Sequence, residues 1–430
     1  MLLVKERMTM KYILTILLLL TLILPAQAEY AVEAVGASDD DVIALDALDE
    51  TCAEVWEAYR QAALEDDRLN EETAMDEMVF GEVSMRYTMM VFGDKPDYGY
   101  PLYIALHGGG AGETPDFNDS QWEDMQEYYT DELECGIYVA VRGVRDTWDT
   151  HFNPESYPLY DRLIEYMILT EDVDSSRVYL MGFSAGGDGV YAISARMPDR
   201  FAAANMCSGH PNGISLLNLR NLPIQLQAGE YDDEFDRNRV TAEYGLKLDE
   251  LQEQFGGGYL HRTLIHYDQG HNYEDYQSAP IPVMTDIAAW LNEGDRTHEN
   301  VDSYPPHYMD QFTRDPYPTE LVWDLSTRAP LRETETFYYL SAPYETDQGI
   351  IMVTADGDNV FEIQTSEDME GEFSMYLNGY MADLSRPVTF IVNGVETTLT
   401  LEPSRAILEE TTADRGDPWY QFEAKVDFKH

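Results

Sequence analysis

The sequence predicts an α/β fold, in which a mostly parallel sheet carries helices on both faces, followed by a smaller all-β region of the sandwich type. The chain has 430 residues, more than one ordinary domain needs. Strand-like and helix-like runs alternate over about 200 residues after position 80, which is typical of a parallel sheet. Short strand-like runs separated by turn signals then continue from position 336 to position 401.

The charge balance excludes several classes of partner. The chain has 81 Asp and Glu against 27 Lys and Arg, a net charge of −54. A field of this sign repels phosphate backbones and anionic lipid, so nucleic-acid binding and electrostatic membrane docking are excluded, and anionic substrates are disfavoured. Because 44% of the residues are hydrophobic and 12% are aromatic, the chain contains enough apolar side chains to form a folded core.

The first 28 residues predict a cleavable signal peptide. Lys5, Arg7 and Lys11 form a positive start, residues 12–24 form an apolar run, and Ala26-Gln27-Ala28 supplies small residues for cleavage after Ala28. No later segment reaches about 18 continuous apolar residues, so no stable membrane anchor is expected. The expected location is therefore outside the cytoplasm, secreted or periplasmic.

Hydrophobic periodicity then divides the mature chain. Residues 29–75 are an acidic N-terminal segment, in which 44–65 have the apolar spacing of an amphipathic helix. Residues 76–295 form the α/β domain. Its buried or alternating apolar runs predict strands at 83–92, 102–106, 137–141, 178–181, 201–206, 224–227 and 259–266. Its helical spacing predicts helices at 121–129, 158–169, 186–196, 238–254 and 283–291.

The rest of the chain is a connector and an all-β domain. Prolines and charges interrupt any periodicity in 296–331. In 332–430, turn signals such as Asn378-Gly379 and Asn393-Gly394 separate short β-type runs, which predicts a β-sandwich-like domain. Its aromatics favour either docking on an insoluble substrate or a sandwich core that supports the α/β domain; they include Tyr338, Tyr339, Tyr344, Tyr376, Tyr380, Trp419 and Tyr420.

The three cysteines give little information on function. Cys52, Cys135 and Cys207 have no metal-binding spacing, and an odd number cannot all pair within one chain. A bridge between Cys52 and Cys135 remains open. No His, Glu or Cys cluster predicts a metal site, no phosphate loop is present, and no cofactor is expected.

The strongest functional motif is Gly182-Phe183-Ser184-Ala185-Gly186. It follows a predicted strand and precedes a predicted helix, and its glycines permit the sharp turn that lifts a serine hydroxyl above a sheet. The start of the following helix favours developing negative charge. Ser184 is therefore the candidate nucleophile.

A glycine-rich turn after an earlier strand predicts an oxyanion hole. His107-Gly108-Gly109-Gly110 ends the strand at 102–106. Backbone N–H groups of Gly108 and Gly109, together with that of Ala185, are the expected donors to the oxyanion.

A serine nucleophile needs a base, and the base needs an acid that orients it. Asp232 follows the strand at 224–227 and is the preferred acid, with Asp233 and Asp236 as rivals. His271 follows the last predicted strand of the sheet and is the preferred base, with His266 and His210 as alternatives.

These motifs resemble the α/β-hydrolase superfamily, in particular its secreted esterase and polyester-depolymerase-like branch. The resemblance covers residues 82–293, about half the chain, and implies a nucleophile at Ser184, an acid at Asp232 and a base at His271. It leaves the roles of the N-terminal helix and the C-terminal β region open.

Two further residues are weaker candidates for substrate binding. Trp148 and His210 each follow a predicted strand, which puts them at the rim of the expected site, although either residue can also simply pack its loop. Asp188 is expected to support the nucleophile turn.

Together these features predict a serine esterase that cleaves carboxylic esters through an acyl-enzyme. The expected substrate is a neutral ester, small or polymeric, or an acylated glycan. A serine peptidase on the same fold is the alternative within enzymes, and a non-catalytic ligand-binding protein is the alternative of another class.

Overall fold

The computed structural model describes residues 29–38, 41–110, 114–131, 133–272, 282–284, 287–291, 299–300, 304–332 and 336–430. The expected signal peptide, residues 1–28, lies outside this part of the chain. Within it, no helix is both long and apolar enough to cross a bilayer.

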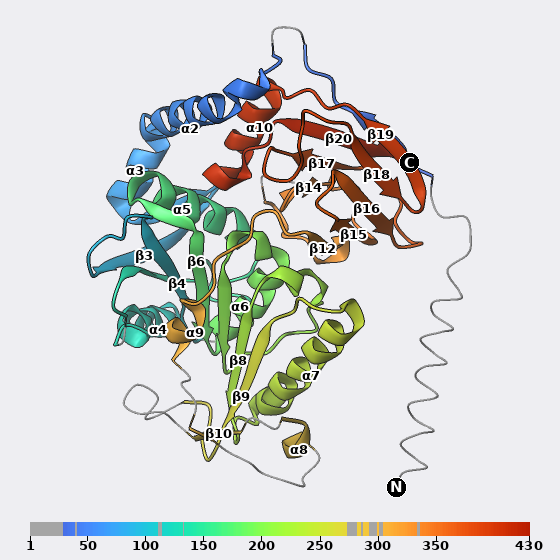
Figure 1. Ribbon diagram of the computed structural model, residues 1–430. Helices are drawn as coiled ribbons and strands as arrows, with labels where there is room; N and C mark the ends of the chain where they lie inside the picture. Colours follow the sequence, from blue (N-terminus) through green and yellow to red (C-terminus); the bar gives the residue numbers. More distant parts are fainter. Residues whose placement is uncertain are drawn as a thin grey trace, which may run out of the picture.

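A ten-stranded sheet forms the centre of the α/β region (Figure 1), in the order β11-β10-β9-β8-β7-β6-β4-β5-β3-β2. The six strands from β4 to β9 run parallel, and the outer strands on both sides pair antiparallel. The strands are β2 (Glu77–Phe80), β3 (Val83–Phe92), β4 (Tyr100–Leu106), β5 (Gly136–Val141), β6 (Val173–Phe183), β7 (Ala203–Cys207), β8 (Ile224–Gly229), β9 (His261–His266), β10 (Pro282–Met284) and β11 (Glu299–Asn300).

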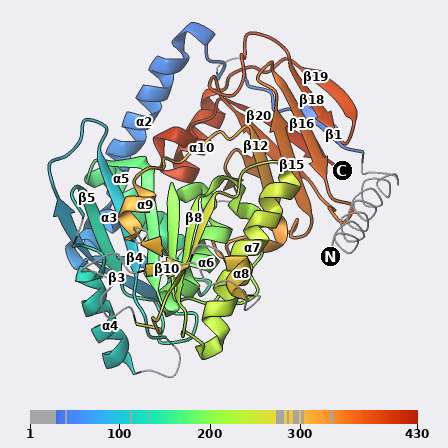
Figure 2. The ribbon, with the colours of Figure 1, turned by 60° about the horizontal axis from the view of Figure 1, so that its bottom comes forward.

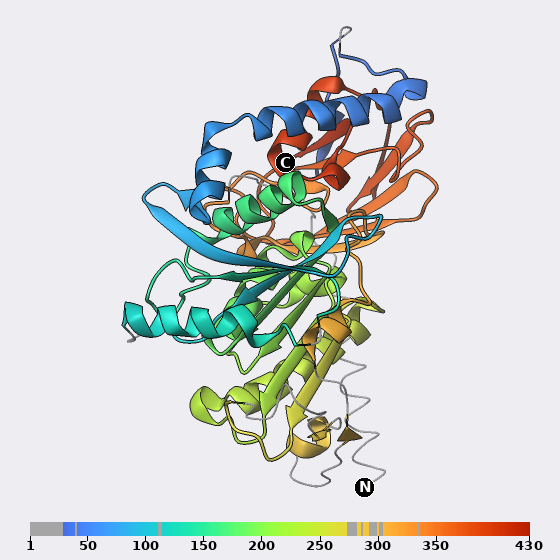
Figure 3. The ribbon, with the colours of Figure 1, turned by 90° about the vertical axis from the view of Figure 1, so that its left-hand side faces the viewer.

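Helices cover both faces of this sheet, as predicted (Figure 3). On one face, α5 (Ser156–Thr170), α6 (Ala185–Arg196) and α7 (Arg237–Phe255) share a large apolar core with the strands. On the other face, α4 (Pro115–Tyr128) and α9 (Pro305–Met309) pack over a second core. The central strands are buried on both sides, which explains why their sequences are continuously apolar.

The predicted helix at 283–291 is wrong in its first part. Val283 and Met284 pair antiparallel with His266 and Ile265, and so extend the sheet as β10. Only the later part is helical, as α8 (Ile287–Leu291). Periodicity alone does not separate so short an apolar run into strand and helix.

The C-terminal β region consists of two five-stranded sheets around one apolar core. Phe390 of one sheet meets Phe428 of the other with ring centroids 5.8 Å apart. The first sheet contains β1 (Ala31–Ala34), β20 (Ala424–Lys429), β17 (Phe373–Leu377), β14 (Leu340–Ser341) and β13 (Thr336–Phe337). The second contains β12 (Glu320–Asp324), β15 (Ile350–Ala355), β16 (Val360–Thr365), β18 (Val388–Val392) and β19 (Val395–Leu399).

Three elements of this region differ from the expectation. β1 comes from the N-terminal segment, and β12 comes from the stretch expected to be a connector. A helix, α10 (Arg405–Arg415), stands within the stretch expected to be all-β. Ser404 caps its first turn, and Gly416 ends it in the left-handed conformation.

The N-terminal segment joins the two regions. The amphipathic run forms α2 (Leu48–Leu64), which lies along α10 and also contacts α5 (Figures 1 and 2). Val55 of α2 packs with Ile43 and Leu408 in a small separate core. α3 (Asp67–Met75) follows and contacts β2.

A buried cluster of charges lies where the α/β region meets the C-terminal β region. We call it the interface ion cluster; it comprises Asp161, Asp199, Arg200, Arg314, Arg332, Arg415 and Asp417. Arg415 of α10 binds Asp199 at 2.6 Å, and Arg314 binds Asp417 at 2.8 Å. Burial alone would raise the pKa of Asp199, but the charges of Arg332 and Arg415 outweigh it and hold this pKa well below its usual range.

The aromatic residues named above for the β region fall into a buried group and an exposed group. Tyr338, Tyr339, Tyr376 and Tyr420 are buried in the core of the β region, whereas Tyr344, Tyr380 and Trp419 are exposed. Cys52, Cys135 and Cys207 are all free thiols, so the bridge left open between Cys52 and Cys135 does not form in this structure.

Candidate active site

Ser184 occupies a sharp turn between β6 and α6. Its backbone has φ 57° and ψ −119°, a conformation that non-glycine residues rarely adopt. Close packing holds the turn: a Cβ on Gly182 would lie 2.4 Å from the carbonyl oxygen of Gly186, and a Cβ on Gly186 would lie 2.1 Å from that of Leu106. Both positions therefore require glycine, which explains the spacing of the motif.

The side chains of Ser184, His271 and Asp232 form a continuous chain of hydrogen bonds. His271 Nε2 lies 2.9 Å from Ser184 Oγ. His271 Nδ1 lies 3.0 Å from each carboxylate oxygen of Asp232. With the ring proton on Nδ1, Nε2 is free to accept the serine proton, which is the arrangement a general base needs.

Burial and position separate the preferred acid and base from their rivals. Asp232 is buried, whereas Asp233 and Asp236 are exposed. His266 lies in β9 against Gln227, and burial lowers its pKa to about 3. The His266 imidazole is therefore uncharged and stays in contact with Gln227. The structure brings together the three residues that the sequence analysis preferred.

The glycine turn after β4 lies directly against the nucleophile. A Cβ on Gly108 would be 3.4 Å from the Cβ of Ser184, and a Cβ on Gly110 would be 3.4 Å from that of Ala185. Gly109 has φ 98°, which glycine adopts readily. The N–H of Gly110 donates to Asn118 Oδ1 at 2.8 Å, so Gly110 is not a free donor. The expected oxyanion donors remain the N–H groups of Gly108, Gly109 and Ala185.

Two buried histidines orient this turn. His107 Nε2 accepts the N–H of Gly143 at 3.0 Å, so its ring proton is on Nδ1, which donates to the carbonyl of Gly108 at 2.5 Å. His151 Nε2 donates to the carbonyl of His107 at 2.8 Å. Burial lowers the pKa of His107 to about 4 and that of His151 well below its ordinary value. Pinning a carbonyl fixes its peptide plane, and therefore the direction of the next N–H group.

Comparison with known proteins finds two relatives that each match about a third of the chain. The bifunctional acetylxylan esterase/xylanase XynS20E of Neocallimastix patriciarum is 30% identical over 144 residues, which are 33% of this chain and 20% of that protein. Feruloyl esterase B of Thermothelomyces thermophilus is 28% identical over 139 residues, which are 30% of this chain and 46% of that protein. About a third of the chain is therefore similar in sequence to known carboxylic ester hydrolases.

The chain spans a fifth and just under half of the lengths of these two relatives. No protein-family model matches it. Among solved structures, a thermostable esterase aligns with a TM-score of 0.38 and 19% identity, over 55% of this chain and 62% of that one.

Of the weaker candidates, Trp148 lies beside the glycine turn. A Cβ on Gly110 would be 3.7 Å from the Cα of Trp148, whose side chain is exposed. His210, in contrast, bonds to residues that shape its own loop. Its backbone N–H donates to Asp188 Oδ1 at 2.7 Å, and its Nδ1 lies 3.0 Å from Asn212 Oδ1. Asp188 is half-buried, desolvation raises its pKa, and it holds the loop that carries His210.

The sequence analysis missed Phe117 and Asn118 of α4. The Cε1 atom of Phe117 lies 3.5 Å from where a Cβ on Gly109 would stand, so its ring lies at the rim of the oxyanion turn. Asn118 is buried and bonds both to the turn and to Asp146. Neither residue belongs to a sequence motif, so the sequence carried no signal for either of them.

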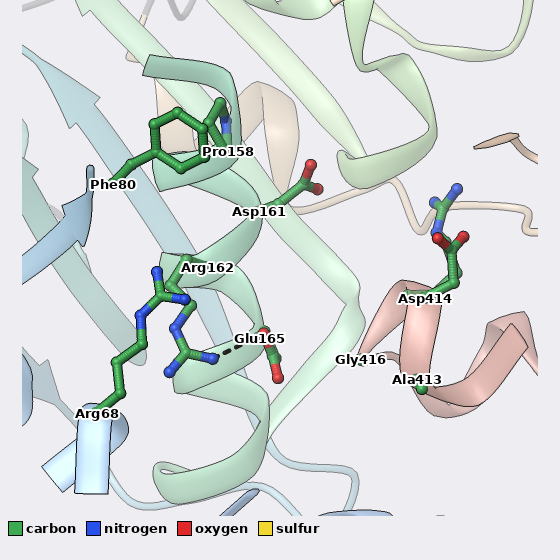
Figure 4. Close-up of a pocket in the computed structure, with 10 residues that line it drawn as sticks. Arg68, Phe80, Pro158, Asp161, Arg162, Glu165, Ala413, Asp414 and Gly416 are labelled. Carbon is green, nitrogen blue, oxygen red and sulfur yellow. Dashed lines mark hydrogen bonds and ion pairs between the residues drawn. The ribbon is translucent and has the colours of Figure 1, made fainter. Parts of the chain in front are cut away.

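A separate pocket lies between α5 and the end of α10 (Figure 4), lined by Arg68, Phe80, Pro158, Asp161, Arg162, Glu165, Ala413, Asp414, Arg415 and Gly416. It shares no residue with the Ser184 site. Its charges are paired, as in the contact of Arg162 with Glu165 at 3.4 Å. In the described part of the chain, no group of three or more His, Cys, Asp or Glu side chains is arranged to hold a metal ion.

Proposed function

We propose that the protein is a secreted serine hydrolase that cleaves carboxylic esters through an acyl-enzyme. The observation that carries the proposal is the unbroken chain of hydrogen bonds from Ser184 through His271 to Asp232, at 2.9 and 3.0 Å. The similarity of part of the chain to esterases supports the same reaction.

In the proposed first step, Ser184 Oγ attacks the ester carbonyl while His271 Nε2 takes its proton. The N–H groups of Gly109 and Ala185 stabilise the oxyanion. Asp232 stabilises the imidazolium without taking its proton. His271 then protonates the departing alcohol, which leaves the acyl group on Ser184. Water, activated by His271, releases the acid by the same route.

We propose an ester of a neutral glycan as the substrate class. The two relatives are named as an acetylxylan esterase and a feruloyl esterase. The net charge of −54 opposes the approach of anionic substrates, whereas a neutral glycan ester meets no such barrier.

For the C-terminal β region we propose support of the α/β region. In the interface ion cluster, buried charges of the two regions pair with each other. Removing one member of a pair would leave the other as an uncompensated buried charge. α6 has 12 residues, about 18 Å of helix, and its N-terminal end carries Ser184 while its C-terminal end leads to Asp199 and Arg200. The contacts of the β region with this cluster therefore lie at the opposite end of α6 from Ser184.

The decisive experiment compares wild type with Ser184→Ala on a short-chain nitrophenyl ester and on a peptide anilide. Wild type is expected to prefer the ester and to take a fluorophosphonate label. The variant should lose at least about 10³-fold in kcat and all labelling, with its unfolding transition unchanged. Faster cleavage of the anilide would favour the peptidase. Absence of both activities and of labelling would favour the ligand-binding protein.

A further inference from the structure

The turn that follows β7 contacts the backbones of both the nucleophile and the base. The carbonyl of Cys207 accepts the N–H of Ser184 at 3.0 Å. The next residue, Ser208, donates its hydroxyl to the carbonyl oxygen of His271 at 3.2 Å. Two adjacent residues of one turn therefore hold both partners of the proposed proton transfer.

The turn itself is fixed by close packing. Ser208 is fully buried, and its N–H donates to the carbonyl of Gln227 in β8 at 2.8 Å. A Cβ on Gly209 would lie 2.3 Å from the carbonyl carbon of Gly187, in the first turn of α6. The turn thus lies between the sheet and the helix that begins after Ser184, which gives the Ser208 hydroxyl a rigid support.

The loop that carries His271 depends on this hydroxyl for its later part. The N–H of Tyr231 donates to the carbonyl of Gln269 at 2.8 Å and holds the earlier part. Among the described residues, the Ser208 hydroxyl is the one group that forms a hydrogen bond with the backbone of 270–272. A peptide that tilts here would move the imidazole away from the nucleophile, and displacements of about 1 Å between reacting groups cost up to about 100-fold in rate.

The backbone of Ser208 also favours a role for its side chain. Its φ of 50° lies in the left-handed region, which glycine adopts readily and other residues adopt at a cost. The backbone alone would therefore favour glycine at this position. The hydrogen bond to His271 explains why a hydroxyl is present in spite of that cost.

We propose that Ser208 is a positioning residue for the general base: its hydroxyl fixes the carbonyl of His271 and thereby holds the imidazole beside Ser184. Ser208 acts through His271 and takes no part in the proton transfers. The inference rests on the proposed ester hydrolysis and adds a residue on which its rate depends. Loss of the hydroxyl should therefore lower kcat and leave KM unchanged, because substrate binding is not altered.

The test replaces Ser208 with glycine, which removes the hydroxyl and suits the left-handed backbone. On 4-nitrophenyl acetate, Ser208→Gly should lose at least about 10-fold in kcat, with KM changed less than about twofold. The rate of fluorophosphonate labelling of Ser184 should fall by the same factor, while the melting temperature stays within about 3 °C of wild type. Ser208→Ala should show the same loss of kcat. Asn212→Gly is the matched control, because Asn212 has the same φ of 50° in the same loop, and its kcat should equal that of wild type.

A second background separates positioning of the base from general support of the fold. In His271→Ala no base remains, so adding Ser208→Gly should change the residual hydrolysis less than about twofold. A further loss of about 10-fold in that background would show that the hydroxyl supports the nucleophile turn or the fold directly, which overturns the inference.

The outcomes also separate the inference from the proposed function. If wild type hydrolyses the ester and Ser208→Gly has the same kcat, only the role of Ser208 is overturned. If wild type neither hydrolyses the ester nor takes the label, the proposed function fails, and the role of Ser208 fails with it.

Discussion

The glycines around Ser184 are required by contact with the neighbouring backbone. A Cβ at position 182 would stand 2.4 Å from the carbonyl oxygen of Gly186, and that oxygen belongs to helix backbone that cannot move aside. We expect Gly182→Ala to displace the turn, lower the melting temperature and abolish most ester hydrolysis. Differential scanning calorimetry and the nitrophenyl assay measure both effects.

The matched control is Gly379→Ala, because a Cβ there meets nothing within 4 Å and the backbone is not left-handed. An equal loss in both variants would show that alanine at any glycine destabilises the protein, and that the turn has no special requirement.

Three buried histidines make stability depend on pH in a defined window. Burial lowers the pKa of His107 to about 4, that of His266 to about 3 and that of His151 well below its ordinary value. The folded state keeps them neutral, while the unfolded chain protonates them below about pH 6.5. Their contribution is complete above that pH and is lost as the pH falls toward 4, by about 1.4 kcal/mol per pH unit for each histidine.

Urea unfolding at pH 7.5, 6.0 and 5.0 in 1 M salt should therefore show falling stability. The salt is part of the design, because acidification also relieves repulsion among the surface carboxylates and so acts in the opposite direction. Stability that is constant or rises over this range in high salt would contradict the neutral histidines.

The sequence was informative about site residues wherever a local pattern carried them. Ser184 has its glycines, and Asp232 and His271 each follow a strand whose end the apolar pattern marked. Phe117 and Asn118 were missed because their importance comes from contact with Gly109 and Gly110, which are close in space but have no spacing rule in the sequence. The orienting role of His151 likewise appears only when its imidazole meets the carbonyl of His107.

Among the elements, strands of the parallel sheet were predicted well because each is buried on both faces and reads as a continuous apolar run. The C-terminal β region was harder. β12 and β1 belong to its two sheets but lie outside the stretch expected to form it. β1 pairs with β20, almost 400 residues away, and so distant a pairing leaves no local signal. β12 lies among the prolines and charges that suggested a connector, and it pairs with β15. α10 shows the same limit, because its apolar positions cover only one short face.

The interface ion cluster predicts a large effect from a single conservative change. Asp199 accepts from Arg415 at 2.6 Å and lies 3.5 Å from Arg332, with all three side chains buried. Asp199→Asn leaves these guanidinium groups without their counter-charge, and we expect a loss of about 3–5 kcal/mol in the free energy of unfolding. Chemical denaturation of the purified protein measures it.

Asp172→Asn is the control for this change, because the pair of Asp172 with Lys95 is exposed and screened by solvent. Equal shifts in the two variants would mean that the cluster contributes no more than a surface ion pair.

At the scale of the whole molecule, the two regions are expected to be inseparable. Cutting the chain after Leu291 removes Tyr308 and Met309, which cover one face of the main sheet, and every partner of Asp199 in the β region. We expect the remnant to aggregate or to lose nitrophenyl ester hydrolysis, measured by gel filtration and the assay, because an apolar face would be exposed.

A double variant tests the alternative role of the β region, which is docking on a polymer. Tyr380→Ala with Trp419→Ala removes two neighbouring exposed rings, 6.3 Å apart, and leaves the core of the β region intact. A soluble, active remnant after truncation, together with loss of binding to insoluble glycan in the double variant, would favour docking over support.

The pairing of β1 with β20 sets Ala31 opposite Lys429, so the first described strand lies beside the last strand of the fold. In a variant that starts at Glu29, a linker of a few residues would therefore join the two ends, and new ends could be opened at a turn such as Asn393-Gly394. Such a circular permutant would keep every layer of the fold. In the variant without the linker, a mechanical load applied at Ala31 and Lys429 would fall first on this one pair of strands.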